Sequence, residues 1–468
     1  MRDMTKGSEF RHILAFSLPL FIGNVLQQLY FFIDSIIIGR FRGANAFAAV
    51  NAATPVLFLM IALVMGLTMG ATIMISQFFG AKDHDRLRRT YATSMIFYLG
   101  AAVVVTVVGL LVSRPLLVLL DTPAEILPGA LAFLKVSFAG ITGMILYNSF
   151  AAFLRGVGDS KTPLYFLAIS TVLNIGLDFV FIAGLGMGPE GVALGTVIAQ
   201  TVSGVLCLVY INRRVPILKL SRKDLVFDGK LFATSIRVGL PMAVQQSVLG
   251  ISGLAVQGLV NSFGLVTVTA YGAAIRIDQI ATAFILSIGM STTTFTGQNV
   301  GAGRFDRVGK GLRASLVLMV LICVVITGIV LLFGEQLIAM FVGAGDTGVL
   351  QQGGEYLRVV SVFYVVFGLM FCMNGVLRGS GDVMVPLYTT IATLVTRVAA
   401  AYVLSAIASI GHRGIWWSIP VSWVLASSIS TMRYFSGAWK TKALTARNRR
   451  EAAANAAAQV ILEEECLS

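Results

Sequence analysis

Charged side chains are scarce in this sequence. They make up 12% of its residues, whereas 57% are hydrophobic, and a soluble domain carries about 25% charged residues. This composition excludes an ordinary soluble protein. A bilayer span needs about 20 mostly apolar residues, and the chain contains twelve such stretches, at 12–39, 46–77, 91–112, 128–153, 162–184, 191–212, 233–262, 266–296, 313–333, 355–376, 385–408 and 414–436. The first stretch is too long for a cleavable signal peptide, and no small-residue cleavage site follows it.

Cysteine and histidine are also few and scattered. The four cysteines and three histidines lie far apart, which excludes a disulfide framework and a metal cluster. Two glycine-rich segments resemble phosphate loops, 186–191 and 303–311, but neither has the strand–helix setting or the Lys-Ser/Thr pair that nucleotide sites need. No nucleophile, metal or paired-acid motif faces a membrane surface. The sequence therefore predicts no enzyme, no ATP-driven transport and no organic cofactor.

The net charge of +13 follows the membrane topology. If the N-terminus is cytoplasmic and the spans alternate in direction, 27 of the 35 lysines and arginines fall on the cytoplasmic side, as the positive-inside rule requires. This distribution argues against nucleic-acid binding. Trp416 and Trp417 fall at the outer end of the last span, where interface anchors are expected. We expect a multi-pass protein of the cell membrane (inner or plasma membrane) with cytoplasmic N- and C-termini.

The sequence repeats itself at an offset of about 222 residues. Three signatures recur in the same order, and each copy of the repeat holds six spans. They are Leu18-Pro19-Leu20 with Leu240-Pro241-Met242, Gln77-x-x-Gly80-Ala81 with Gln298-x-x-Gly301-Ala302, and Leu154-Arg155-Gly156-x-Gly158-Asp159 with Leu377-Arg378-Gly379-x-Gly381-Asp382. Because six is even, both halves enter the membrane in the same direction, and a substrate is expected at the interface between such parallel repeats.

These motifs, together with Gly184-Leu185-Gly186-Met187-Gly188 before the sixth span, resemble the multidrug and toxic compound extrusion (MATE) transporters, and most closely their DinF-like branch. The resemblance covers about residues 12 to 437. It implies an all-α integral membrane fold of 12 transmembrane helices in two parallel six-helix lobes arranged as a V. The expected division is an N-lobe at 1–212, a cytoplasmic linker at 213–232, a C-lobe at 233–437 and a cytoplasmic tail at 438–468.

The two Leu-Arg-Gly loops are predicted to be structural. Glycine supplies the backbone freedom for tight turns, and Pro163 and Pro386 suit the first turn of the helix that follows each loop. We expect Arg155 and Arg378 to meet lipid phosphates or helix-end carbonyls.

Three acidic residues lie deep in apolar spans: Asp34, Asp178 and Asp278. A charge at the centre of a bilayer costs about 2.5–3.5 kcal/mol on insertion scales, so such residues point to function. Asp34 follows Tyr30 by four residues and Asp178 follows Asn174 by four, which places each pair on one helix face. Two neighbouring carboxylates in a dry site cannot both stay charged cheaply, so they need a proton or Na⁺.

The resemblance implies that these residues bind the coupling ion, H⁺ or Na⁺, and that Pro19 lets the first span bend. The implied site is Tyr30, Asp34, Asn148, Asn174, Asp178 and Thr196. Its hydroxyl and amide oxygens complete an oxygen shell, and no metal other than Na⁺ is expected. The alternative is a static, hydrogen-bonded acid pair that only stabilises the lobe.

The second half does not repeat this acid pair. Val256 and Ala401 take the places of Asp34 and Asp178, and Phe367 stands where the NorM-like branch carries an acid in the tenth span. The C-lobe instead holds other polar residues that could bind substrate or pair with one another, namely Gln245, Gln246, Gln257, Asn261, Arg276, Asp278, Asn374 and Arg397. We expect Asp278 to form an ion pair with Arg397 or Arg276, although a substrate or ion role for Asp278 remains open.

The predicted function is a cation-coupled antiporter that exports cationic or amphipathic drugs and toxic compounds by alternating access. Its partners are a small organic substrate, most simply a cation, and membrane lipid, with no nucleic acid, and the chain is expected to act as a monomer. Arg397 leaves an anionic substrate open. A flippase for lipid-linked oligosaccharides or lipids is the alternative, but the twelve spans and the acidic N-lobe site favour the exporter.

Overall fold

The computed structural model describes residues 1–220, 224–343 and 345–444. These residues form helices and no strands, as predicted. Parts of the predicted linker and tail, with Cys466, lie outside the described residues. The helices are α1 (Glu9–Gly80), α2 (His84–Leu119), α3 (Leu127–Ala139), α4 (Ile141–Gly156), α5 (Lys161–Asp178), the π-helix η1 (Phe179–Gly184), α6 (Pro189–Arg214), the 3₁₀-helix η2 (Pro216–Leu218), α7 (Gly229–Ser262), α8 (Leu265–Gly301), α9 (Phe305–Val342), α10 (Thr347–Val362), α11 (Tyr364–Ser380), α12 (Met384–Ser405), α13 (Arg413–Phe435) and the 3₁₀-helix η4 (Ala438–Lys442).

The described helices account for the twelve predicted spans. Eight are long and apolar enough to cross a membrane, and two pairs bent by 52° (α3 with α4) and 47° (α10 with α11) each make one further span. α1 counts twice, because Gly43 (φ 81°, ψ −177°) breaks this 72-residue helix into two. α13 is more polar, but its 23 residues are long enough to supply the twelfth span.

The repeat extends to the backbone breaks. Gly43 separates the first two spans with φ 81°, and Gly264 separates α7 from α8 with φ 87°. Gly158 and Gly381 turn the two Leu-Arg-Gly loops with φ 83° and 94°. Glycine adopts positive φ without the penalty that a Cβ brings, so the predicted tight turns are confirmed. The α3–α4 and α10–α11 bends are also 223 residues apart.

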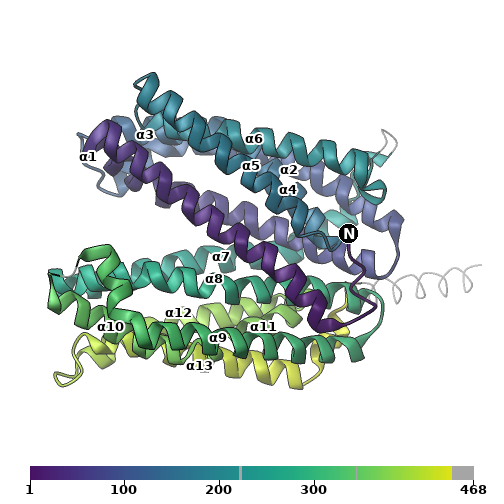
Figure 1. Ribbon diagram of the computed structural model, residues 1–468. Coiled ribbons are helices and arrows are strands. Elements are labelled where there is room, and N and C mark those ends of the chain that lie inside the picture. Colours follow the sequence, from purple (N-terminus) through teal and green to yellow (C-terminus); the bar gives the residue numbers. More distant parts are fainter. Residues whose placement is uncertain (221–223, 344, 445–468) are drawn as a thin grey trace, which may run out of the picture.

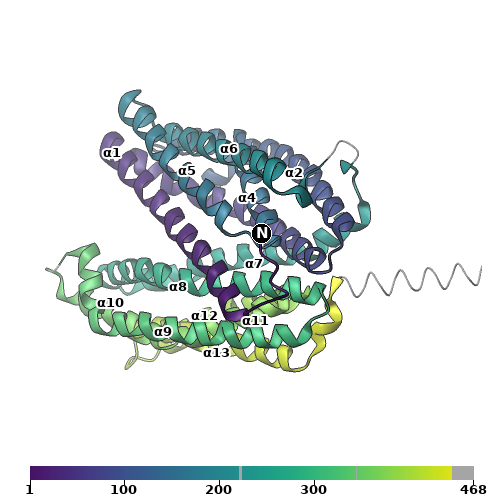
Figure 2. The same ribbon diagram turned by 45° about the vertical axis from the view of Figure 1, so that its right-hand side comes forward.

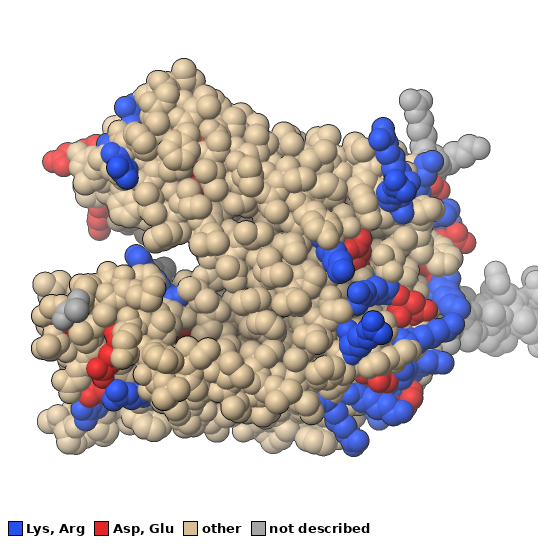
Figure 3. Space-filling view, viewed as in Figure 1, with Lys and Arg blue, Asp and Glu red and all other residues tan. Residues whose placement is uncertain are grey.

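The helices form two bundles with a cleft between them. α1–α6 lie in one and α7–α13 in the other (Figures 1 and 2). In the space-filling view the cleft is open at the left-hand end, whereas lysine and arginine side chains gather at the right-hand end, where the N-terminus lies and the bundles meet (Figure 3). We call the latter the basic end. The open end and the basic end are thus opposite faces of the molecule.

The first span of α1 runs obliquely from one bundle to the other (Figure 1). Near the basic end it packs on α8 of the second bundle: Asn24 donates to Ser287 Oγ (3.1 Å), and the rings of Phe21 and Phe284 lie 4.5 Å apart. Further along, Ile37 and Ile38 belong to the hydrophobic core of the first bundle. One helix therefore contributes to the cores of both halves, and the lobe boundaries drawn from the sequence stay a prediction.

Two expectations about single residues were wrong. Trp416 is fully buried and stacks on Tyr271 at 5.7 Å, while Trp417 is 44% exposed. Successive helix residues point about 100° apart, so only Trp417 lies where an interface anchor can. Arg378 is buried away from the surface where lipid phosphates lie, and its guanidinium donates to the Gln245 side chain (Oε1, 3.0 Å) where a helix-end carbonyl was the other expected partner.

The two bundles also touch closely where α1 crosses α7. A Cβ at Gly66 would collide with the backbone of Ala243, and one at Gly70 would lie 2.7 Å from the Gly239 Cα. Only residues without a side chain allow helix backbones to approach so far. This crossing therefore depends on glycine for steric reasons, since both Gly66 and Gly70 have ordinary helical φ angles.

We predict that Gly66→Ala lowers the free energy of unfolding by about 1–3 kcal/mol, the usual cost of overpacking. Gly258→Ala is the matched control in α7, where a Cβ would meet nothing within 4 Å; it should be neutral or slightly stabilising. Thermal unfolding in detergent measures both. Equal melting temperatures for the two variants would contradict the close approach.

Candidate functional site

Five of the six predicted ion-site residues come from three helices that contact one another, α1, α5 and α6. Tyr30 and Asp34 lie one turn apart on α1, Asn174 and Asp178 one turn apart at the end of α5, and Thr196 lies on α6. The structure brings these five side chains together. The spacing of four residues has the predicted effect, because it turns both members of each helical pair toward the same neighbour.

Asn174 is the centre of a hydrogen-bond network. In the amide orientation that satisfies its neighbours, it donates to Asp34 Oδ1 (2.9 Å), and its oxygen accepts from the Thr196 backbone N–H (3.3 Å) and lies 3.2 Å from the Tyr30 hydroxyl. Tyr30 in turn donates to Thr196 Oγ1 (2.6 Å). The network holds Asp34 in place from two other helices.

The second carboxyl group has no such support. Asp178 is 0% exposed, and neither of its oxygens accepts a hydrogen bond from a donor group in the described part of the chain. Its carboxyl lies within hydrogen-bonding reach of that of Asp34, which is 6% exposed. This contact becomes a hydrogen bond only when one of the two carboxyl groups carries a proton. A buried carboxylate without a donor is costly, so the arrangement calls for a proton or a cation.

Gly195 on α6 makes room for this arrangement, and the sequence analysis missed it. A Cβ at this position would lie 2.5 Å from Asp178 Oδ1 and 3.4 Å from Asn174 Nδ2. Any side chain would therefore press into the acid pair. The one signal in the sequence is that a glycine precedes Thr196, which does not tell this glycine from the many others in the spans.

Two further N-lobe residues do not join the network. The Asn148 side chain donates to the carbonyl of Met144 on its own helix (2.9 Å). α1 continues through Pro19, because Gly43 is the residue with non-helical backbone angles inside it. Proline still removes one helical hydrogen bond, so this part of α1 is weakened without being broken. An ion-binding role for Asn148 and a hinge at Pro19 both stay predictions.

The second bundle gives Asp278 a different partner from the one expected. Its carboxylate accepts a hydrogen bond from the Tyr364 hydroxyl (2.8 Å). The described residues contain no ion pair between Asp278 and Arg397 or Arg276, so the predicted pair was wrong. Arg397 donates to the Tyr271 hydroxyl (3.2 Å) instead. Asp278 and Arg397, both partly buried, are thus each hydrogen-bonded to a tyrosine hydroxyl and not to each other.

The remaining C-lobe polar residues fall into two groups. Gln245 and Asn374 are buried and hydrogen-bonded to Thr390 (2.7 Å) and Thr389 (3.3 Å), so they hold helices together. A second group is more accessible: Gln257 donates to Asn261 (2.9 Å), Gln246 is partly buried, and Arg276 is exposed with its guanidinium 6.0 Å from the centre of the Phe341 ring.

The C-lobe does not repeat the acid pair. The repeat-related positions hold Val256 and Ala401, both 0% exposed. Two apolar side chains therefore fill the space that Asp34 and Asp178 occupy in the first bundle. The described residues also contain no group of three or more His, Cys, Asp or Glu that could hold a metal ion, so the paired carboxyl groups of the first bundle are the distinctive ionisable feature of the spans.

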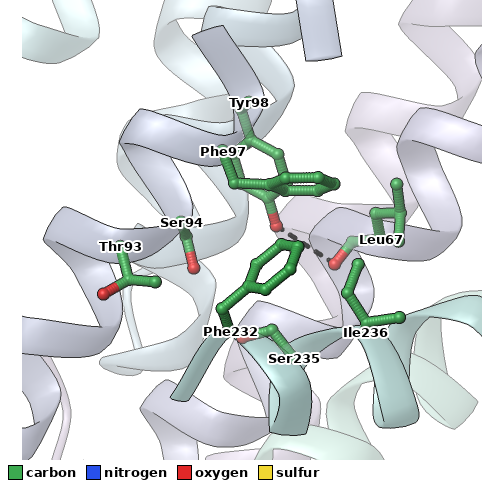
Figure 4. A pocket seen from close by; sticks show the side chains of 8 residues that line it. All are labelled: Leu67, Thr93, Ser94, Phe97, Tyr98, Phe232, Ser235 and Ile236. Carbon is green, nitrogen blue, oxygen red and sulfur yellow. Dashed lines mark hydrogen bonds between the residues drawn. The ribbon is translucent and has the colours of Figure 1, made fainter. Parts of the chain in front are cut away.

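The small cavity in Figure 4 is a separate feature. It lies between α1, α2 and α7, where the Tyr98 hydroxyl donates to the Leu67 carbonyl (3.1 Å). Its walls carry no acid, and they are made by Leu67, Thr93, Ser94, Phe97, Tyr98, Phe232, Ser235 and Ile236. The cavity is therefore a small gap in the packing between the bundles, and it offers no site for a cation.

Comparison with known proteins agrees with this architecture. The family model described as MatE matches residues 19–180 and 241–403, once in each half of the chain. "Probable multidrug resistance protein YoeA" of Bacillus subtilis (strain 168) is 30% identical, over 94% of this chain and 96% of its own length.

Two solved structures share the fold. One is described as "Outward-facing conformation of a multidrug resistance MATE family transporter of the MOP superfamily" (25% identity, TM-score 0.88), the other as "Crystal structure of MATE in the bent conformation" (25% identity, TM-score 0.87). Each match covers 94% of this chain and 98% of the other. The repeated family match, the relative and the shared fold lead to one conclusion: this chain belongs to the MATE family of multi-pass membrane transporters.

Proposed function

We propose that the chain is an antiporter that exports organic, drug-like cations in exchange for H⁺. The observation that carries the proposal is the Asp34–Asp178 contact, in which a fully buried carboxyl group has no hydrogen-bond donor among the described residues other than a protonated neighbour. The name of the Bacillus relative, a probable multidrug resistance protein, supports drug export. The DinF-like branch fits because the acid pair lies in the first bundle.

A proton suits this site better than Na⁺ on two grounds. Asn174 turns an amide N–H toward Asp34, and the backbone N–H of Thr196 points at Asn174. These are donors, whereas Na⁺ needs several oxygen ligands. The carboxyl groups also approach closely enough to share a proton. Na⁺ remains the alternative, since the Tyr30, Thr196 and Asn174 oxygens with the two carboxylates supply five oxygen-bearing groups.

Coupling to movement runs through α1. Asp34 and Tyr30 lie on the part of this span that packs in the first bundle, while Phe21 and Asn24 contact α8 of the second. When the acid pair gains or loses its cation, the preferred position of α1 against α5 changes. The weakened helix at Pro19 then lets the two parts of α1 move by different amounts. This is the mechanical step of alternating access.

The orientation follows from the basic end. If the positive-inside rule holds, the basic end with the N-terminus faces the cytoplasm and the open cleft in Figure 3 faces outward. The conformation is then outward-facing, in which H⁺ enters the acid pair and substrate leaves. Each bundle packs around its own core within one chain, and we propose that the monomer is the working unit.

The substrate is proposed to bind in the cleft, against accessible polar residues of the second bundle such as Gln257 and Asn261. A lipid flippase, the rival function, requires a lipid headgroup to pass along a cationic surface, for which Arg276 and Arg397 are the available groups. Proteoliposomes separate the two: an imposed pH gradient should drive a cationic dye and should not scramble a labelled lipid. Lipid scrambling without dye transport would refute the exporter.

Asp34→Asn and Asp178→Asn should each reduce gradient-driven dye export at least tenfold, because an amide cannot exchange a proton. Flux is measured with pH and Na⁺ gradients imposed separately, and the wild type should respond to the pH gradient. The control is Asp121→Asn, an exposed loop position with φ 52° that asparagine tolerates. Full export by both mutants at normal protein levels would overturn the assignment, and wild-type flux that follows Na⁺ alone would transfer the role from H⁺ to Na⁺.

Gly195→Ala should also impair export, since its Cβ would lie 2.5 Å from Asp178 Oδ1. Gly176→Ala is the matched control on α5, where a Cβ meets nothing within 4 Å. We expect a loss of at least fivefold in pH-driven flux for Gly195→Ala and none for Gly176→Ala, at equal amounts of folded protein. Equal flux in both variants would show that the space beside Asp178 is not critical.

Tyr364→Phe should destabilise the protein by about 1–3 kcal/mol, the cost of leaving the partly buried Asp278 carboxylate without its donor. Asp278→Asn should likewise lower yield more than export per folded molecule. Thermal unfolding provides the measurement, with Tyr388→Phe (55% exposed) as control. Normal stability with lost export in the Asp278 variant would assign this residue to transport.

A further inference from the structure

The N-terminal segment is built into the closed end of the molecule. Met4 is 0% exposed, and its backbone N–H donates to Gln298 Oε1 (2.9 Å) near the end of α8. Its carbonyl accepts from Asn299 Nδ2 (3.2 Å). Two residues earlier, the Arg2 carbonyl lies directly over Gly158, in the Leu-Arg-Gly loop of the first bundle. The segment thus bridges the two bundles at the basic end.

The C-terminal segment makes the equivalent contacts with the repeat-related residues. The Leu444 backbone N–H donates to Gln77 Oε1 (2.9 Å) near the end of α1. Two residues earlier, the Lys442 carbonyl would lie 3.0 Å from a Cβ at Gly381, in the Leu-Arg-Gly loop of the second bundle. Gln77 and Gln298 are repeat-related, and so are Gly158 and Gly381. Two segments of unrelated sequence therefore occupy equivalent positions on the two halves.

The side-chain amide of each glutamine also donates a hydrogen bond to the opposite bundle. Gln77 Nε2 donates to the Gly379 carbonyl (2.8 Å), and Gln298 Nε2 donates to the Gly156 carbonyl (3.2 Å). Both glutamines are 0% exposed. All four of these residues belong to the repeated motifs that the transport proposal left without a role.

Glycine at the next turn allows this contact. A Cβ at Gly80 would collide with the Gln298 carbonyl, and one at Gly301 would collide with the Gln77 carbonyl. The backbones of α1 and α8 therefore meet around a local twofold axis at the basic end. Because both glutamines are satisfied on the oxygen and the nitrogen, pulling the bundles apart here leaves buried amides without partners, which is costly.

We propose that Gln77 and Gln298, each with its docked terminal segment, form the gate that closes the basic end of the transporter. The inference rests on the proposed alternating access: opening toward the cytoplasm must break the two cross-bundle amide bonds and undock Met4 and Leu444. The glutamine gate carries no charge of its own. It therefore does not respond to the coupling ion directly, and the movement of α1, which carries Gln77 and follows the Met4 segment, must open it.

A cysteine reporter at Ser76 tests the gate. Ser76 is 0% exposed beside Gly297 at this interface. In a chain whose four native cysteines are replaced, Ser76→Cys should react slowly with a soluble maleimide in nanodiscs. Adding Gln77→Leu or Gln298→Leu should speed labelling about five- to thirtyfold, the change in an open population that one or two lost interactions produce. The exposed Gln336→Leu is the control substitution.

Met4→Asp and Leu444→Asp change the docked segments themselves and leave every residue of helices α1–α13 unchanged, so they remain informative if a glutamine variant fails to fold. Both should speed Ser76→Cys labelling, whereas Thr441→Asp, at an exposed position, should not. Labelling at the control rate in folded Met4→Asp and Leu444→Asp proteins would overturn the gate. The readout needs no transported drug or ion gradient, so loss of the antiport proposal in the Asp34→Asn assay would be a separate result.

Discussion

Two carboxyl groups that touch where water does not reach cannot both carry a charge, and the rest of the first bundle is arranged around that constraint. Asn174 and Tyr30 fix Asp34, and Gly195 leaves the volume that Asp178 fills. Coulomb repulsion in a medium of low dielectric constant makes the pair bistable with respect to its cation. Under the proposed mechanism, the hydrogen bonds that hold Asp34 pass a change of ion occupancy on to α1 and α5.

The helix that receives this change is the one that both bundles share. The first span of α1 packs on α8 near the basic end and carries Asp34 of the acid pair further along. In the proposed mechanism, a change of protonation in the first bundle therefore acts on the contact with the second bundle through this one helix. The terminal segment that precedes this span reaches Gln298 and Gly158 at the basic end, so site, interface and gate lie on one continuous piece of chain.

The sequence could predict the features that follow from the free-energy cost of placing polar groups in a membrane. Twelve spans, the three deep acids and the asymmetry between the halves all follow from the cost of placing charge in hydrocarbon. It could not predict features that depend on which helix faces pack against each other. The partner of Asp278 is Tyr364, which is 86 positions away, and Trp416 turns inward although its neighbour does not. Gly195 and the docking of Met4 and Leu444 required the packed helices, because nothing in their local sequence distinguishes them.

The acid pair occurs in only one of the two repeated bundles, and this has an evolutionary consequence. A doubled scaffold whose bends and turning glycines match on both sides supplies two equivalent bundles, of which one carries the acid pair. Val256 and Ala401 show that the second bundle lacks this acid pair. Under the proposed mechanism, substitutions in the second bundle can change the transported substrate without altering ion coupling. Recognition of new compounds and use of the ion gradient can therefore evolve separately.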